Sequence, residues 1–143
     1  MARIVIGVGN DLRGDDAAGW ETVRRLVPSP SLSLHEHGGD APGLVGLWGP
    51  DDDVVVVDAV VSSDPAGTIV EIDALATPLP ADVRWTTTHG AGVAEGIELA
   101  RTLGMLPKSL VLIGISARAF DLGAPMTADV ERAVQDVVRK LSE

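Results

Sequence analysis

Three side chains able to bind a metal ion lie next to predicted strands and helices: Asp16, Asp58 and His89. Asp16 follows a β-branched strand and a glycine loop, Asp58 comes directly after four valines, and His89 lies in a loop that opens a helix. Because the carboxyl ends of neighbouring parallel strands share one edge of a sheet, the two acids can converge there, and the loop can bring His89 to them. Two carboxylates and one imidazole suit nickel, zinc or iron, with positions left for water or substrate.

Each of the three residues also has an ordinary structural interpretation. Asp16 can be a carboxylate favoured by the positive end of a helix dipole, and this interpretation suits the adjacent Asp15 better. His89 alone would be an ordinary loop histidine. Asp58 is harder to explain in this way, because an acid in a predicted interior strand must be paired or lie at a functional edge. From the residues alone, the metal site and the ordinary interpretation both stay open.

Other motifs in the sequence are weaker. His35 and His37 would share one face of a short strand, but no third ligand is suggested beside them, and we expect both at the surface. The Gly7-x-Gly9 loop matches half of a dinucleotide-binding fingerprint, yet the third glycine would fall at Leu12, which argues against a nucleotide-binding domain. The chain has no cysteine, which excludes thiolate zinc sites and cysteine nucleophiles, and it has no Gly-x-Ser-x-Gly serine motif.

The predicted elements that must position these residues alternate between strand and helix. Residues 53–61 form the clearest strand, whose valine run is typical of a central parallel strand covered on both faces. A last helix from about Thr127 carries an apolar stripe. The other predicted strands cover residues 4–6, 31–36, 67–72, 83–88 and 109–115, and the other helices follow the first glycine loop, span 40–48 and open at 90–92. We expect an α/β fold, a three-layer sandwich with a largely parallel, twisted sheet of about five strands between helices, in a single domain over residues 1–143.

The composition narrows the classes of partner. The 143 residues are 45% hydrophobic, as expected for a packed globular protein, and carry a formal net charge of −10. No basic stripe is present, which argues against a nucleic-acid partner. No apolar run reaches membrane-spanning length and no leader pattern is visible. We therefore expect a cytoplasmic protein with no nucleic-acid or membrane partner.

The first glycine loop and its acids resemble the amino-terminal signature of one enzyme family. The stretch from Gly7 to Gly19, GVGNDLRGDDAAG, contains Gly-x-Gly-Asn, an apolar residue two positions later, a paired acid, and a glycine three residues further on. It is similar to the signature of the hydrogenase maturation endopeptidases, which remove a carboxy-terminal extension from the large subunit of nickel–iron hydrogenases. The resemblance covers essentially the whole chain, because the Gly38-Gly39 turn, the Asp58 strand and the His89 loop follow in the family's order.

The resemblance implies roles for the three candidate residues. In the family, an acid in the first loop, an aspartate after the central strand and a histidine before a helix bind the nickel-containing site. These positions match Asp16, Asp58 and His89, which would then be both the metal-binding and the catalytic residues, with nickel supplied by the precursor rather than permanently bound. The chain departs from the family at His37, where an acid is frequent, and at Asp40, where a threonine is frequent, and both changes concern the substrate cleft.

We therefore expect a hydrolase, an endopeptidase that processes a nickel–iron hydrogenase large-subunit precursor and recognises its inserted nickel. The metal would polarise the scissile carbonyl or lower the pKa of a bound water, with Asp15 or a freed carboxylate as the base. A non-catalytic nickel-dependent chaperone or binding module for the same precursor would keep the same three ligands and is the alternative. No apolar stripe is left exposed by the predicted elements, so we expect a monomer.

Overall fold

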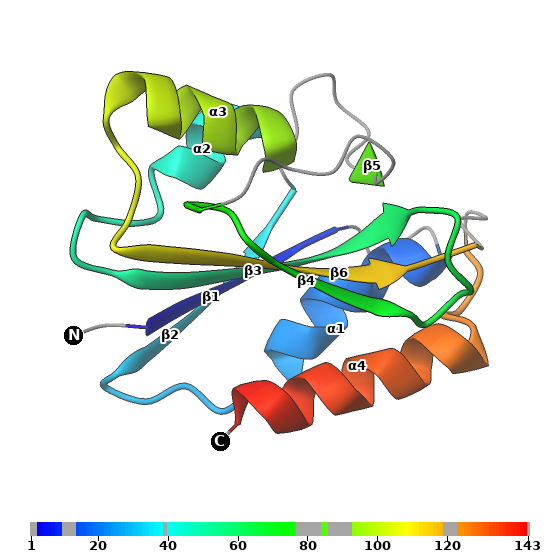
Figure 1. Ribbon diagram of the computed structural model, residues 1–143. Helices are drawn as coiled ribbons and strands as arrows, with labels where there is room; N and C mark the ends of the chain where they lie inside the picture. The colour runs from blue at the N-terminus through cyan, green and yellow to red at the C-terminus, as the bar shows by residue number, and fades with distance from the viewer. Residues whose placement is uncertain are drawn as a thin grey trace.

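The computed structural model describes residues 3–9, 14–38, 40–76, 84–85, 93–118 and 123–142. Its strands and helices alternate along the chain except where β3, β4 and β5 follow one another, and they form three layers, with α2 and α3 on one face of a sheet and α1 and α4 on the other (Figure 1). The strands are β1 (Arg3–Val8), β2 (Leu32–His37), β3 (Asp53–Val61), β4 (Ile69–Asp73), β5 (Arg84–Trp85) and β6 (Ser109–Ser116). The helices are the 3₁₀ helix η1 (Gly14–Ala17), α1 (Ala18–Arg24), α2 (Ala41–Val45), α3 (Val93–Leu103) and α4 (Ala128–Leu141).

The sheet is largely parallel, as the sequence predicts. Its strand order is β2-β1-β3-β6-β4, and the two-residue β5 pairs with β3 beside this path. The strands β2, β1, β3 and β6 are parallel to one another, whereas β4 and β5 run antiparallel to their partners. The valine-rich β3 lies between β1 and β6, as expected for a strand whose two faces are both covered by helices.

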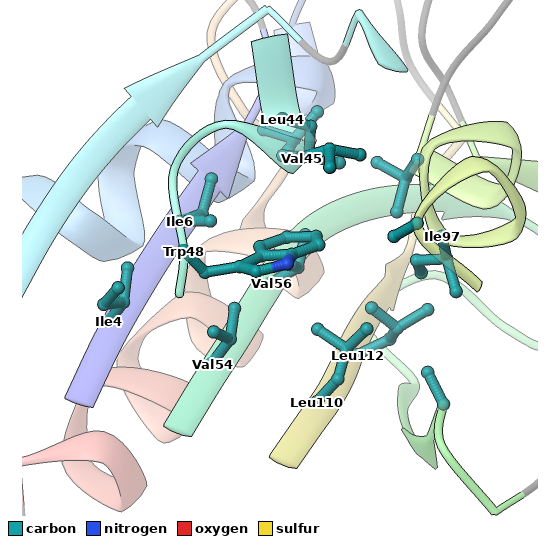
Figure 2. Close-up of a cluster of buried hydrophobic side chains, with 14 of the residues drawn as sticks. Ile4, Ile6, Leu44, Val45, Trp48, Val54, Val56, Ile97, Leu110 and Leu112 are labelled. Carbon is teal, nitrogen blue, oxygen red and sulfur yellow. The ribbon is translucent and has the colours of Figure 1, made fainter. Parts of the chain in front are cut away.

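Alternate side chains of the central strands β1, β3 and β6 enter two separate hydrophobic clusters. Val54 and Val56 of β3 face α2 and α3, in a cluster that includes Leu44, Ile97 and Leu112 (Figure 2). Val55, Val57 and Ala59 face the other way, toward α1 and α4. Because side chains of a strand point alternately to opposite faces, Asp58 lies on the α2 and α3 face, in line with Val54 and Val56.

The helix α1 lies directly on the backbone of the sheet. An ideal Cβ atom on Gly7 of β1 would lie 2.1 Å from the carbonyl oxygen of Gly19, and one on Gly19 would lie 2.2 Å from the carbonyl oxygen of Val8. Neither position therefore has room for a side chain. The glycines of the first motif serve this close approach, which sets the position of η1 at the end of β1.

The predicted helices agree with the structure in place but not in length. The sequence predicts that the first helix ends at Pro28 and Pro30, whereas α1 ends at Arg24 and the N–H of Leu26 donates to the carbonyl of Val23 at 3.1 Å. Of the predicted extended segment 83–88, residues 84–85 form β5 and the others lie outside the described residues. None of the helices in the described ranges combines the length and the apolar character needed to cross a membrane.

Candidate active site at the carboxyl edge of the sheet

Asp58 is a fully buried carboxylate at the place where β1 ends. Its exposed fraction is 0%. The pairing of β1 with β3 stops at Gly7 and Val57, so Asp58 is the first residue of β3 beyond it. The strand itself continues to Val61, because β6 still pairs with it, and the partner of Asp58 on β6 is Gly114. Since a glycine adds no side chain next to it on that face, the β6 side of Asp58 is not filled by a neighbouring strand residue.

Asp16 is a second buried carboxylate at the same edge. It lies in η1, which contacts β3, and it is 3% exposed. Gly14 begins η1 with a φ of 57°, a left-handed conformation that favours glycine. An ideal Cβ on Gly9 would lie 2.2 Å from the carbonyl oxygen of Asp16, so Gly9 lies directly against η1. The structure therefore brings Asp16 and Asp58 to one edge, as the sequence predicts.

Asp15, next to Asp16, is also fully buried, and its carboxylate accepts several hydrogen bonds. Thr127 donates to it from its backbone N–H at 2.7 Å and from Oγ1 at 3.0 and 3.1 Å, and the N–H of Arg118 donates at 3.3 Å. Asp15 thus connects η1 to the end of β6 and the start of α4. This arrangement supports the ordinary structural interpretation of Asp15 and makes it a poor candidate for the general base.

His89, the third predicted ligand, lies outside the described residues. Within the parts of the chain that the structure does describe, no cluster of three or more His, Cys, Asp or Glu side chains could hold a metal ion. Of the three residues of the predicted triad, the structure therefore describes Asp16 and Asp58. The nearest described residue after His89 is Val93, which begins α3 and is fully buried in the cluster on the same face of the sheet as Asp58.

His37 lies on the same face of the sheet as Asp58. It is the last residue of β2 and the register partner of Val8, so its side chain is on the same face as Asp58. The imidazole is only 15% exposed, with Nε2 3.6 Å from Oδ1 of Asp40. The expectation that His35 and His37 are both at the surface is wrong, because both are half-buried in β2. The burial of both histidines follows from the register of β2 with β1. The alternation of residue types within β2 alone could not predict this burial.

Two ion pairs attach α1 to its neighbours, and each lowers the pKa of its carboxyl group. A side-chain hydrogen bond from Arg25 lowers the pKa of the Glu131 carboxyl, which joins α1 to α4. A side-chain hydrogen bond from Arg24 lowers the pKa of the Glu36 carboxyl, which joins α1 to β2. Both pairs hold α1 in place against its neighbours, and through α1 they hold η1.

The fold is that of an α/β protein with two buried acids, Asp16 and Asp58, near the carboxyl edge of a largely parallel sheet. Comparison with protein families gives the particular family: the model described as hydrogenase maturation protease matches residues 21–143. The chain belongs to the hydrogenase maturation proteases, a family of peptidases. The expectations of a peptidase and of a role in hydrogenase maturation are therefore confirmed, and the match begins after the glycine motif on which the resemblance was based.

Relatives and solved structures agree with this family. The chain is 28% identical over 145 residues to the hydrogenase expression/formation protein HupD of Thiocapsa roseopersicina, covering 98% of this chain and 66% of that protein. It is 26% identical over 151 residues to the hydrogenase 2 maturation protease of Escherichia coli, covering 99% of this chain and 88% of that one. The structure of the [NiFe] hydrogenase maturation protease HybD from Thermococcus kodakarensis matches with a TM-score of 0.80 and 27% identity, and all of both chains is covered.

Proposed function

We propose that this protein removes a carboxy-terminal extension from the large-subunit precursor of a nickel–iron hydrogenase, and that it recognises nickel already inserted in that precursor. The observation that carries the proposal is the pair of buried acids, Asp16 and Asp58, at one edge of the sheet. Carboxyl ends of parallel strands meet at one edge of a sheet, so both acids belong to the same part of the molecule. A divalent cation delivered by the substrate would interact favourably with two carboxylates placed there.

The donor set fits an ion that the substrate delivers. Two carboxylates and the imidazole of His89 are oxygen and nitrogen ligands of a kind that nickel accepts, and three ligands leave positions for groups of the precursor. When bound, the ion would polarise a carbonyl or make a water molecule more acidic. The chain's own contribution is to hold Asp16 and Asp58 at fixed places, because η1 is packed against Gly9 and β3 is fixed between β1 and β6.

Family membership favours cleavage over the chaperone alternative, and one experiment separates the two. The purified protein is incubated with nickel-loaded precursor, and loss of the carboxy-terminal extension is followed by mass spectrometry. We expect cleavage by the wild type and none by His89→Ala. His35→Ala is the matched control, because His35 is half-buried in β2 and lies outside the proposed triad; we expect it to cleave normally. Nickel-dependent binding without cleavage by the wild type would favour the chaperone.

The assembly state and the location are part of the same proposal. We propose a monomer, because the large exposed hydrophobic side chains found in the described residues are few and are spread over several elements: Val27, Ile69, Leu103 and Met105. Light scattering during size-exclusion chromatography tests this directly, and a dimer at micromolar concentration would contradict it. We also propose the cytoplasm as the place of reaction, which cell fractionation tests.

A further inference from the structure

The carboxylate of Asp15 is held by groups that are more than a hundred positions away in the chain. Its exposed fraction is 0%, and its hydrogen bonds come from Thr127 and from the backbone of Arg118. These two residues bracket the connection between β6 and α4. A single buried side chain of η1 therefore fixes both ends of that connection, and the connection in turn fixes η1.

Thr127 is used for this contact rather than for capping its own helix. It is the N-cap residue of α4, a position where threonine normally accepts a hydrogen bond from a backbone N–H of the first turn. Here its side chain makes no capping hydrogen bond, and its hydroxyl donates to Asp15 instead. The N-terminus of α4 therefore has no side-chain cap from Thr127, whose hydroxyl bonds to Asp15 of η1 instead.

Asp15 and Asp16 point to different sides because η1 is a 3₁₀ helix. With three residues per turn, consecutive side chains diverge by about 120° around the helix axis. When one of the two side chains is held against α4, the direction of the next is determined as well. Asp15 sets the position of Asp16 from one side. The close approach of Gly9 to the carbonyl oxygen of Asp16 sets it from the other side.

We propose that Asp15 is a positioning residue, which holds η1 against the β6–α4 connection so that Asp16 is presented at the sheet edge occupied by Asp58. This inference rests on the proposed function, because it assigns Asp15 a role in the site of that reaction. It differs from a role as general base, which needs an oxygen that reaches the substrate. It also differs from a purely structural role, which would affect stability without acting through Asp16.

The test uses Thr127→Val, which removes the hydroxyl bond and keeps the backbone N–H bonds of Thr127 and Arg118 to Asp15. Thr22→Val is the matched control, because Thr22 is also a fully buried threonine whose hydroxyl donates a hydrogen bond, to the carbonyl of Ala18 at 2.8 Å. Nickel affinity of the protein alone is measured by titration calorimetry, and kcat and KM are measured on nickel-loaded precursor. Asp15→Asn is examined in the same way.

We expect Thr127→Val to weaken nickel binding and to lower kcat by about tenfold, the scale for residues that orient a ligand. The control should change neither quantity. In an Asp16→Ala background, Thr127→Val should cause no further loss of nickel affinity, because the residue it acts through is gone. An equal further loss in that background would overturn the proposal, and so would a lower melting temperature with unchanged affinity and kcat.

The outcomes separate this inference from the proposed function. If the wild type binds nickel but does not cleave the precursor, the proposed function fails. The effect of Thr127→Val on nickel affinity, measured with and without Asp16→Ala, still decides the role of Asp15. If the wild type neither binds nickel nor distinguishes nickel-loaded from nickel-free precursor, the site itself is wrong and the inference falls with it. If cleavage is normal and Asp15→Asn alters only the pH profile of kcat while Thr127→Val has no effect, Asp15 is a base and not a positioning residue.

Discussion

Gly19 of α1 and Val57 of β3 are in such close contact that a Cβ atom on Gly19 would lie 2.5 Å from the carbonyl oxygen of Val57. Gly19 follows Asp16 by three residues, and Val57 immediately precedes Asp58. The same contact therefore fixes the distance between the two chain segments that carry the buried acids. It requires a residue without a side chain, which explains the glycine that follows the paired acid in the sequence motif.

Gly19→Ala should destabilise the protein and separate the two acids. The added methyl would overlap backbone atoms of both β1 and β3, and backbone cannot move aside as a flexible side chain does. We expect a loss of about 1–3 kcal/mol in the free energy of unfolding, measured by urea denaturation, together with reduced cleavage of precursor.

Gly46→Ala is the matched control for this prediction. Gly46 follows α2 with a φ of −71°, and the nearest atom to an added Cβ would be 3.6 Å away, an ordinary contact. The substitution should therefore be neutral or slightly stabilising, since alanine restricts the unfolded chain more than glycine does. Equal destabilisation by both variants would mean that the contact between Gly19 and Val57 has no special role.

Asp58→Asn should separate function from stability. The carboxylate is fully buried, and asparagine has nearly the same shape, so the substitution removes the charge without opening a cavity. A metal contact of about 3 kcal/mol corresponds to roughly a hundredfold in rate, so we expect at least that loss in kcat/KM from a protein that still folds, as checked by circular dichroism. Near-normal cleavage by this variant, with its fold intact, would remove Asp58 from the site.

The ion pair between Arg25 and Glu131 should make a small, pH-dependent contribution to stability. Its two hydrogen bonds measure 2.7 and 2.8 Å, and the side chains are 31% and 40% exposed, so solvent screening limits it to about 1 kcal/mol or less. Because the folded-state pKa of Glu131 is lowered from its ordinary value of 4.5, the contribution is fully present above pH 4.5 and is lost as the pH falls through the lower folded-state pKa.

Glu131→Gln tests this prediction when the free energy of unfolding is measured at pH 7 and again at a pH well below 4.5. The variant should be slightly less stable than the wild type at pH 7, and the difference should shrink toward zero in acid. Asp51→Asn serves as the control for loss of an exposed carboxylate elsewhere on the surface. A difference for Glu131→Gln that grows on acidification would contradict the assigned direction of the pKa shift.

The sequence predicts the parts of this fold that depend on local pattern. The valine run of β3 and the apolar stripe of α4 identify a buried strand and a covering helix, and alternation of elements then implies a parallel sheet. Asp16 and Asp58 follow from the same logic, because parallel strands deliver their carboxyl ends to one edge. The resemblance of the glycine motif to a known family adds the expectation of a peptidase, which the family comparison confirms.

Features that depend on long-range pairing could not be predicted. The hydrogen bond from Thr127 to Asp15 joins residues 112 positions apart, so no local pattern indicates that the Asp15 carboxylate accepts it. The burial of His37 depends on the register that places it beside Val8. The end of α1 at Arg24 lies before the prolines that mark it in the sequence, because a proline excludes a helix beyond itself without determining where the last turn closes.

Recognition by the buried acids of nickel carried by the substrate should make cleavage depend on nickel, so nickel-loaded and nickel-free precursor are compared. Both forms are incubated with the same amount of protein, and the mass of the precursor is followed over time. We expect loss of the carboxy-terminal extension from the nickel-loaded form only, and no loss from either form with Asp16→Asn. Equal cleavage of the two forms by the wild type would mean that the acids do not recognise nickel.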